Sequence, residues 1–445
     1  MKRTLILGTL LLVSLGSLFL TACQSLNTEE NDVTNRWHYG RPLYEVYVRS
    51  FSYDGNLDGV TAKLDELKEL GIKTLWLMPV HPHGELGRKG SMGSPYSTYD
   101  YFAIGEEYGT KEDFRELIEA AHARDMKVIL DIALNHSAND HIEMENHPDW
   151  YAQDSTGAFT REVADWSDIT DWNFDNPETH QYLESILTYW VKEFNLDGYR
   201  CDVAGMVPGE FWFNAIQKIR EIKPNVFMLA EWEDEWILDK GFDAGYDWNL
   251  FHRMRDHKKG SIDLDSLWTA IKSREEKYPE HALPMRFVEN HDEHRSAEEF
   301  GWPGVKPYAA LIFTIPGIPL IYNGQEIGAT HKPTLFETEP VYWAQKQKGV
   351  YAFYHELLKH RNSRDALRAG ASQRIECNDS DVLMFTRTFG KETILVAINF
   401  SDQLKEVAIP EKLLKKRWHL INNEHRFLGE KETLDILDYN MWVRK

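Results

Sequence analysis

The chain has 445 residues, 42% of them hydrophobic, which is enough for one large folded domain and a smaller one and excludes a disordered chain. Its 50 Lys and Arg residues against 71 Asp and Glu residues give a formal net charge of −21 at pH 7. Because nucleic acid is bound through basic surfaces, this charge argues strongly against a nucleic-acid partner. Three cysteines are too few for a disulfide framework.

The N-terminus has the pattern of an export signal. A basic start is followed by an apolar run at 5–20 and then by Leu20-Thr-Ala-Cys23. This ending resembles a bacterial lipobox, in which the Cys23 thiol is acylated and becomes the first mature residue. We expect residues 1–23 to be a lipoprotein signal peptide, residues 24–35 to be a polar tether, and the protein to be exported and lipid-anchored to the membrane of the cell envelope. A cleaved soluble signal and a plain membrane anchor are the alternatives.

After the tether, the pattern alternates between strand and helix. The expected elements are a strand at 43–48, a helix from Leu57 ended by Gly71, a strand at 72–78, a helix opened by a capping box at Thr110 and Asp113, and a strand at 127–133. Repeated strand-then-helix units indicate parallel strands with crossover helices.

This rhythm breaks once, at about 137–175, which we interpret as a short excursion from a barrel loop. The spacing of the next two strand ends is close to the roughly 31 residues of one unit in a (β/α)8 barrel. The last strand is expected at 317–322 and the last helix at 350–361, followed by short alternating strands. The sequence therefore predicts an α/β fold, a TIM barrel over 36–365, with a C-terminal all-β sandwich at 371–445.

Four acidic segments follow apolar runs that read as strands. They are Asp131-Ile-Ala-Leu-Asn-His136, Gly198-Tyr-Arg-Cys-Asp202, Glu231-Trp-Glu and Phe287-Val-Glu-Asn-His-Asp292. Any single acidic residue is ordinarily a solvated surface charge. Acidic residues at one end of several parallel strands meet at a common mouth, which is where barrel enzymes have their active sites.

Breaking a glycosidic bond requires a protonated acid at the leaving oxygen and a carboxylate at the anomeric carbon. Asp202 and Glu231 could supply this pair, because a strand spacing of about 4.8 Å allows the carboxylate separation of about 5 to 5.5 Å found in retaining enzymes. Arg200 precedes Asp202 by two residues, so both side chains should face the barrel interior. The guanidinium would then favour an ionised nucleophile.

The four segments resemble the four signature regions of the α-amylase family of glycoside hydrolases. Residues 317–326 are similar to the family's eighth-strand segment and residues 94–101 to its second-strand loop, so the resemblance spans roughly 40–330. It implies a retaining enzyme that cleaves α-glucosidic bonds in starch-derived maltodextrins or oligosaccharides.

By position, the resemblance makes Asp202 the nucleophile, Glu231 the acid/base and Asp292 a third carboxylate that grips sugar hydroxyls and favours ring distortion. Other positions would contact the sugar or support the site. The substrate-binding residues implied are Tyr96, His136, Arg200 and His291, with Asp131 supporting the site through hydrogen bonds.

Two departures from the family pattern bear on metal and substrate. Many α-amylases continue the nucleophile segment to a Lys-His pair that contacts substrate and helps to hold calcium, whereas this chain runs Asp202-Val-Ala-Gly-Met206. The stretch Asp54 to Asp58 lacks the later ligands of a calcium loop and is interpreted as a turn. We expect no required cofactor and no metal ligands; calcium is possible, but the motifs do not support it. The short excursion and the missing pair favour maltodextrins or small oligosaccharides over long-chain starch alone.

Two other functions remain open at this stage. A transglycosylase of the same family would use the same carboxylates, since the partition between acceptors depends on the shape of the acceptor site. A non-catalytic glucan-binding surface lipoprotein is the second alternative. The intact set of Asp202, Glu231 and Asp292 argues against it, because a binding module has no need of all three.

Overall fold

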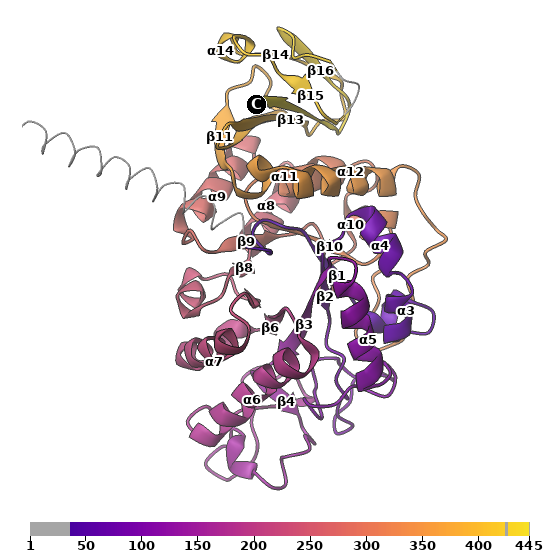
Figure 1. The fold of residues 1–445 in the computed structure, drawn as a ribbon, viewed down its shortest axis with the longest axis vertical. Coiled ribbons are helices and arrows are strands. Elements are labelled where there is room, and N and C mark those ends of the chain that lie inside the picture. The colour runs from indigo at the N-terminus through magenta and orange to yellow at the C-terminus, as the bar shows by residue number, and fades with distance from the viewer. Residues whose placement is uncertain (1–35, 423–425, 445) are drawn as a thin grey trace, which may run out of the picture.

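The computed structural model describes residues 36–422 and 426–444, and its centre is a closed barrel of eight parallel strands in the order β1-β10-β9-β8-β7-β6-β3-β2. Helices surround the barrel, and a separate β region lies at one end of the molecule (Figure 1). The barrel strands are β1 (Leu43–Val46), β2 (Thr74–Leu77), β3 (Lys127–Ala133), β6 (Gly198–Asp202), β7 (Phe227–Ala230), β8 (Ala244–Tyr246), β9 (Leu283–Arg286) and β10 (Ile318–Tyr322). The predicted (β/α)8 barrel is confirmed.

The helices predicted from Thr110 and at 350–361 are both observed. The α-helices around the barrel are α2 (Val48–Phe51), α3 (Leu57–Thr61), α4 (Leu64–Leu70), α5 (Lys111–His122), α6 (Pro177–Phe194), α7 (Gly209–Ile222), α8 (Trp248–Lys258), α9 (Leu264–Lys277), α10 (Ser296–Glu299), α11 (Lys306–Thr314), α12 (Val350–Ser363) and α13 (Asp365–Ala369). The capping box at the start of α5 is confirmed, and Gly71 ends α4 in the left-handed conformation.

Two local predictions were wrong. The first strand ends at Val46 rather than at residue 48, because the chain turns into α2. The single helix expected from Leu57 is two helices, because the backbone at Lys63 is not helical (φ −100°, ψ 1°). Apolar residues continue across this break with helical spacing, so the periodicity alone does not reveal it.

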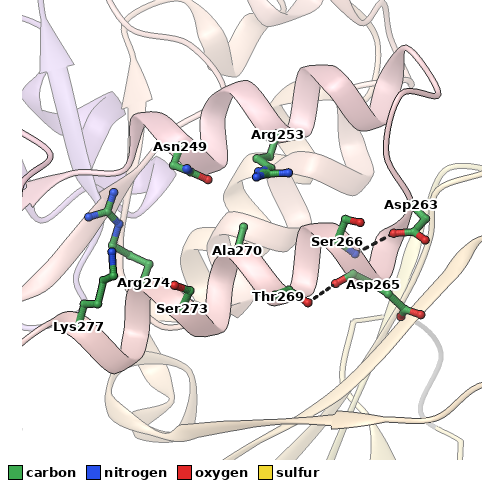
Figure 2. Close-up of a pocket in the computed structure, with 10 residues that line it drawn as sticks. All are labelled: Asn249, Arg253, Asp263, Asp265, Ser266, Thr269, Ala270, Ser273, Arg274 and Lys277. Atoms are coloured by element: carbon green, nitrogen blue, oxygen red, sulfur yellow. Dashed lines mark hydrogen bonds between the residues drawn. The ribbon is translucent and has the colours of Figure 1, made fainter.

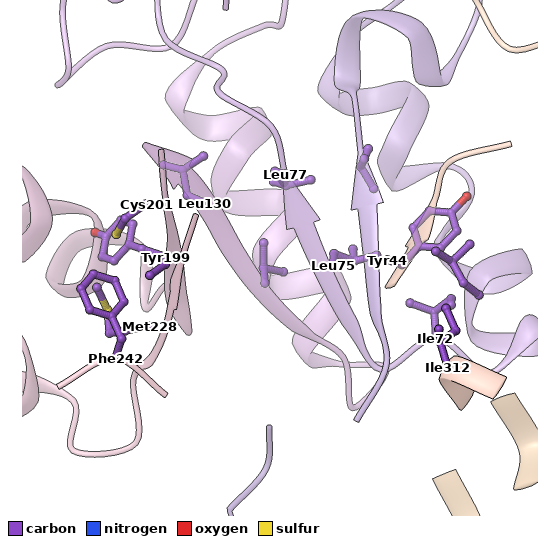
Figure 3. Packing of buried hydrophobic residues seen from close by; sticks show 14 of the residues in the cluster. Tyr44, Ile72, Leu75, Leu77, Leu130, Tyr199, Cys201, Met228, Phe242 and Ile312 are labelled. Atoms are coloured by element: carbon purple, nitrogen blue, oxygen red, sulfur yellow. The ribbon is translucent and has the colours of Figure 1, made fainter. Parts of the chain in front are cut away.

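Alternate residues of each barrel strand face opposite sides. Leu75, Leu77 and Leu130 belong to the core between strands and helices (Figure 3), whereas Trp76 and Ile129 belong to a second core inside the barrel. This alternation follows from the two-residue period of a strand. It directs odd-numbered positions of β3 and even-numbered positions of β6 into the barrel.

The segment between β3 and α6 leaves the barrel and contains a short antiparallel pair, β4 (His136–Ala138) and β5 (Ile169–Asp171). After α13, a five-stranded sheet in the order β11-β12-β13-β17-β15 and a two-stranded sheet of β14 and β16 enclose a third core. Their bounds are β11 (Ala371–Ile375), β12 (Val382–Phe389), β13 (Glu392–Asn399), β14 (Lys405–Ala408), β15 (His419–Leu420), β16 (Lys431–Leu434) and β17 (Tyr439–Arg444), with the short helix α14 (Glu411–Leu414) between β14 and β15.

Among residues 36–422 and 426–444, no helix combines the length and apolar character needed to cross a bilayer. The predicted signal peptide, the lipidation site Cys23 and the tether lie outside the described residues.

Candidate active site

Two of the predicted carboxylates lie on neighbouring strand ends at the barrel mouth. Asp202 is the last residue of β6, and Glu231 directly follows β7, whose Ala230 pairs with Cys201. The backbone N–H of Val203 donates to Glu231 Oε2 at 2.9 Å. Val203 has a left-handed backbone (φ 36°), which is strained for a β-branched residue, and this bond helps to hold it there.

Arg200 connects three carboxylates from inside the barrel. Its Nη1 lies 2.8 Å from Asp131 Oδ1 and 2.7 Å from Asp202 Oδ1, and its Nη2 lies 2.9 Å from Glu231 Oε1. Its Nε donates to the Tyr246 hydroxyl at 3.1 Å. The predicted inward orientation of Arg200 is thus observed. Its contact with Glu231, in addition to the expected one with Asp202, orients both carboxylates together.

The carboxyl groups of Asp202, Glu231 and Asp292 differ in pKa because their surroundings differ. Burial raises the pKa of Glu231 to about 8; Arg200 opposes this rise, and the negative charges of Asp202 and Asp292 add to it. Burial also raises the pKa of Asp202, against the opposing charge of Arg200. Burial disfavours ionisation of Asp292 as well, but the adjacent His291 outweighs burial and lowers its pKa well below the ordinary value. Near neutral pH, Glu231 therefore carries a proton and Asp292 does not.

His291 joins the carboxylates to the aromatic wall of the site. Its Nε2 lies 3.1 Å from Asp292 Oδ2 and 2.8 Å from the Tyr96 hydroxyl, and its Nδ1 contacts Glu45. Burial lowers the pKa of His291, but Asp292 and Glu45 raise it further, so that it ends well above its usual value. The Tyr96 hydroxyl donates to Asp131 Oδ2 at 3.0 Å. This chain of hydrogen bonds fixes the positions of Asp292 and Tyr96.

His136 begins β4 beside the cavity, with its ring centroid 5.5 Å from that of Trp166. Burial lowers the pKa of His136 to about 4, so the ring is neutral at physiological pH. A neutral imidazole can both donate and accept a hydrogen bond, which suits a group that contacts sugar hydroxyls.

A cavity of about 250 Å³ lies above these residues, smaller than the roughly 300 to 1,000 Å³ of most drug-sized ligand pockets. Six of the predicted site residues line it: Tyr96, His136, Asp202, Glu231, His291 and Asp292. Arg200 and Asp131 do not line it and support it from below, as expected for Asp131 but not for Arg200.

A larger polar cavity of about 480 Å³ lies between α8 and α9 (Figure 2). Its walls include Asn249 and Arg253 from α8 and Ser266 and Lys277 from α9, and none of its lining residues is among the predicted site residues. The smaller cavity is therefore the candidate active site, because it contains all three predicted catalytic carboxylates, including Glu231 with its strongly raised pKa.

Comparison with known protein families identifies the family of this chain. The chain matches the model of the alpha amylase catalytic domain over residues 24–156 and 143–371, and that of the maltogenic amylase C-terminal domain over residues 373–436. The chain belongs to the α-amylase family.

Individual relatives agree with this assignment. Alpha-amylase MalA of Haloarcula japonica is 30% identical over 400 residues; the match covers 84% of this chain but only 57% of that protein's length. The crystal structure of an α-amylase from Lactobacillus plantarum has a TM-score of 0.85 and 32% identity, covering 91% of this chain and 99% of that one. The maltogenic α-amylase AmyB of Thermotoga neapolitana has a TM-score of 0.84 and 28% identity, covering 91% and 98%.

The structure shows how this α-amylase family member accommodates the missing Lys-His pair. A Cβ atom added at Gly205 would lie 2.0 Å from the indole of Trp232, the residue after Glu231. The space that a side chain at position 205 would need is therefore filled by Trp232. A lysine could enter here only if that indole moved.

The residues around this position do not form a recognisable metal site. Within residues 36–422 and 426–444, no group of three or more His, Cys, Asp and Glu side chains is placed to hold a metal ion. Residues 54–56 form a bend that leads into α3, and Asp58 lies in the first turn of that helix, where Asn56 caps it by accepting a hydrogen bond from the N–H of Gly59. The Asn135 side chain lies 3.5 Å from the His136 ring. Independence from calcium stays a prediction.

Sequence reasoning missed several residues of the site. Glu45 is fully buried in β1 and contacts His291, and its signal was a lone charge inside an apolar strand. Other residues that line the cavity without having been predicted are Lys89, Ser94, Trp166, Asp168, Ile169, Val203, Leu335 and Phe336. Most come from loops without a recognised motif, so nothing local marks them.

Proposed function

We propose that this protein is a retaining glycoside hydrolase that cleaves α-glucosidic bonds in maltodextrins or oligosaccharides. The observation that carries the proposal is the pair formed by Asp202 and Glu231 on adjacent strand ends, both held by Arg200. The similarity to maltogenic α-amylase AmyB and the small cavity support short α-glucans as substrates.

In the first step, Asp202 attacks the anomeric carbon while Glu231 gives its proton to the leaving oxygen. The C1–O bond breaks, the electron pair leaves with that oxygen, and a covalent glycosyl-Asp202 ester forms. Esterification removes the negative charge of Asp202, one of the charges that raise the pKa of Glu231. The pKa of Glu231 therefore falls, and Glu231, now without its proton, can act as the base in the second step.

In the second step, water gives a proton to Glu231 and its oxygen attacks the anomeric carbon from the vacated side, releasing Asp202. Two inversions at one carbon give net retention. Asp292, ionised and held by His291, is positioned to accept hydrogen bonds from sugar hydroxyls.

Retention is tested by proton NMR of the first product formed from a maltooligosaccharide. The α-anomer is expected to appear first and then to mutarotate. Initial release of the β-anomer would overturn the assignment of Asp202 as nucleophile, because it would require direct attack by water.

We also propose that the protein is exported and lipid-anchored through Cys23, since the Leu-Thr-Ala-Cys ending and the polar residues 24–35 favour this location. A Cys23→Ser variant should lose metabolically incorporated palmitate and either leave the membrane fraction or remain uncleaved. If the wild-type protein incorporates no palmitate and stays in the membrane fraction with its signal uncleaved, a plain membrane anchor is indicated instead.

A further inference from the structure

The strand order divides the barrel mouth into two sides. Asp202 and Glu231 end β6 and β7, and β1 lies across the closed barrel from β7, flanked by β2 and β10. The loops that follow β2 and β10 therefore approach the cavity from the side opposite Glu231. Glu231 protonates the leaving oxygen, so the leaving part of the glucan lies on its side of the cavity. The opposite side therefore receives the part of the glucan that extends from the attacked sugar toward the non-reducing end.

The loops after β2 and β10 are tied together across this side. The N–H of Ser91 donates to Glu337 Oε1 at 3.0 Å, and the Ser91 hydroxyl donates to the other oxygen of the same carboxylate. The N–H of Met92 donates to the carbonyl of Phe336 at 2.9 Å. An added Cβ at Gly90 would lie 2.6 Å from the Phe336 Cβ, so the two loops are in close contact.

Lys89, in the loop after β2, connects this pair of loops to the excursion after β3. Its ammonium lies 3.0 Å from Asp168 Oδ1 and donates to the carbonyl of Asp165 at 3.0 Å. From below, the buried Arg49 donates to the carbonyl of Leu335 at 2.9 Å. We call the segments 87–93, 165–168 and 335–337 together the donor arch.

The inner surface of the donor arch is part of the cavity wall. Lys89, Asp168, Leu335 and Phe336 all line it. The Asp168 side chain is only 4% exposed, and its Oδ2 is buried without a hydrogen-bond partner in the described protein. Because a buried carboxylate oxygen normally has a partner, this atom is suited to accept a hydrogen bond from a sugar hydroxyl in the cavity.

We propose that the donor arch closes the non-reducing side of the cleft, so that the enzyme releases a mono- or disaccharide from chain ends rather than cutting within long chains. The inference rests on the proposed hydrolase function and adds its mode of action. Lys89 and Asp168 contact the hydroxyls of the terminal sugar, and Leu335 and Phe336 leave no passage for further units.

The test compares two maltoheptaosides, one free and one whose terminal non-reducing hydroxyls are blocked by a cyclic ethylidene acetal, with cleavage followed by chromatography. Because one surplus methylene already costs 10 to 200-fold in a tight pocket, we expect the blocked substrate to react at least about 100-fold more slowly. Cleavage of both at similar rates would overturn the donor arch and leave the hydrolase intact. Cleavage of neither would remove the hydrolase function and this inference with it.

Opening the donor arch gives a second test. Glu337→Ala removes both contacts to Ser91. It should lower the ratio of the cleavage rates of the free and blocked substrates by about tenfold or more, which corresponds to roughly 1.4 kcal/mol. Glu411→Ala, at an exposed glutamate of the C-terminal region, is the matched control and should leave the ratio unchanged. If Glu337→Ala does not fold, Lys89→Ala is used instead, since it frees Asp168. An unchanged ratio in a folded arch variant would count against the inference.

Discussion

Replacing Asp202 by Asn is expected to lower kcat/KM on maltoheptaose by about 10⁴-fold or more, a loss of roughly 5.5 kcal/mol of transition-state stabilisation. An amide cannot form the covalent ester that the retaining pathway requires. Arg200 would keep Asp131 and Glu231 as partners, so the barrel should stay folded. Steady-state kinetics together with far-UV circular dichroism would separate lost chemistry from lost structure.

The matched control for this variant is Asp58→Asn, which makes the same change at an exposed residue of α3. It should leave kcat/KM within about twofold, because isolated surface substitutions have small effects. If Asp202→Asn kept more than a tenth of the wild-type rate, Asp202 would not be the nucleophile.

Replacing Glu231 by Gln should lower kcat/KM on glucans by about 10² to 10⁴-fold, the usual contribution of a general acid. Fluoride leaves without protonation, so an α-glucosyl fluoride should form the covalent intermediate at close to the wild-type rate. Asp202→Asn should abolish the reaction of both substrates. A burst of fluoride release in Glu231→Gln, measured with a fluoride electrode, is the direct readout.

The pH dependence provides an independent check on Glu231. Its pKa is raised to about 8, and only its protonated form can act as acid. Wild-type kcat/KM on glucans should therefore hold at neutral pH and fall as pH rises through about 8. The Glu231→Gln variant cannot titrate there and should lack this alkaline limb. An alkaline limb that persisted in the variant would assign the titration to another group.

The barrel and the core of the site could be predicted from the sequence because both depend on short-range patterns. Apolar runs with helix signals between them define β3 and α5, and the two-residue period of β6 places Arg200 beside Asp202. The negative charges of Asp202 and Asp292, which the acidic segments bring to the same barrel mouth, account for part of the raised pKa of Glu231. Burial, the larger cause, depends on the folded surroundings and has no local signature.

Contacts between distant segments could not be predicted in the same way. Glu45 and His291 meet although 246 positions separate them, and so do Ser91 and Glu337. Such pairs form only after the barrel has closed, and the loops that carry them have no periodicity. The break at Lys63 was missed for the opposite reason, since its flanking leucines keep helical spacing through a local irregularity.

The pairing of β1 with β10 has a consequence for biogenesis. Leu43 is aligned with Leu320, so the two strands that complete the barrel lie near opposite ends of its sequence. At about 5 to 20 residues per second, a ribosome needs on the order of tens of seconds to make the intervening chain. During that time β1 has no partner on one side, and its unpaired edge is open to aggregation. The barrel of the nascent protein therefore keeps one open strand edge until its last strand emerges.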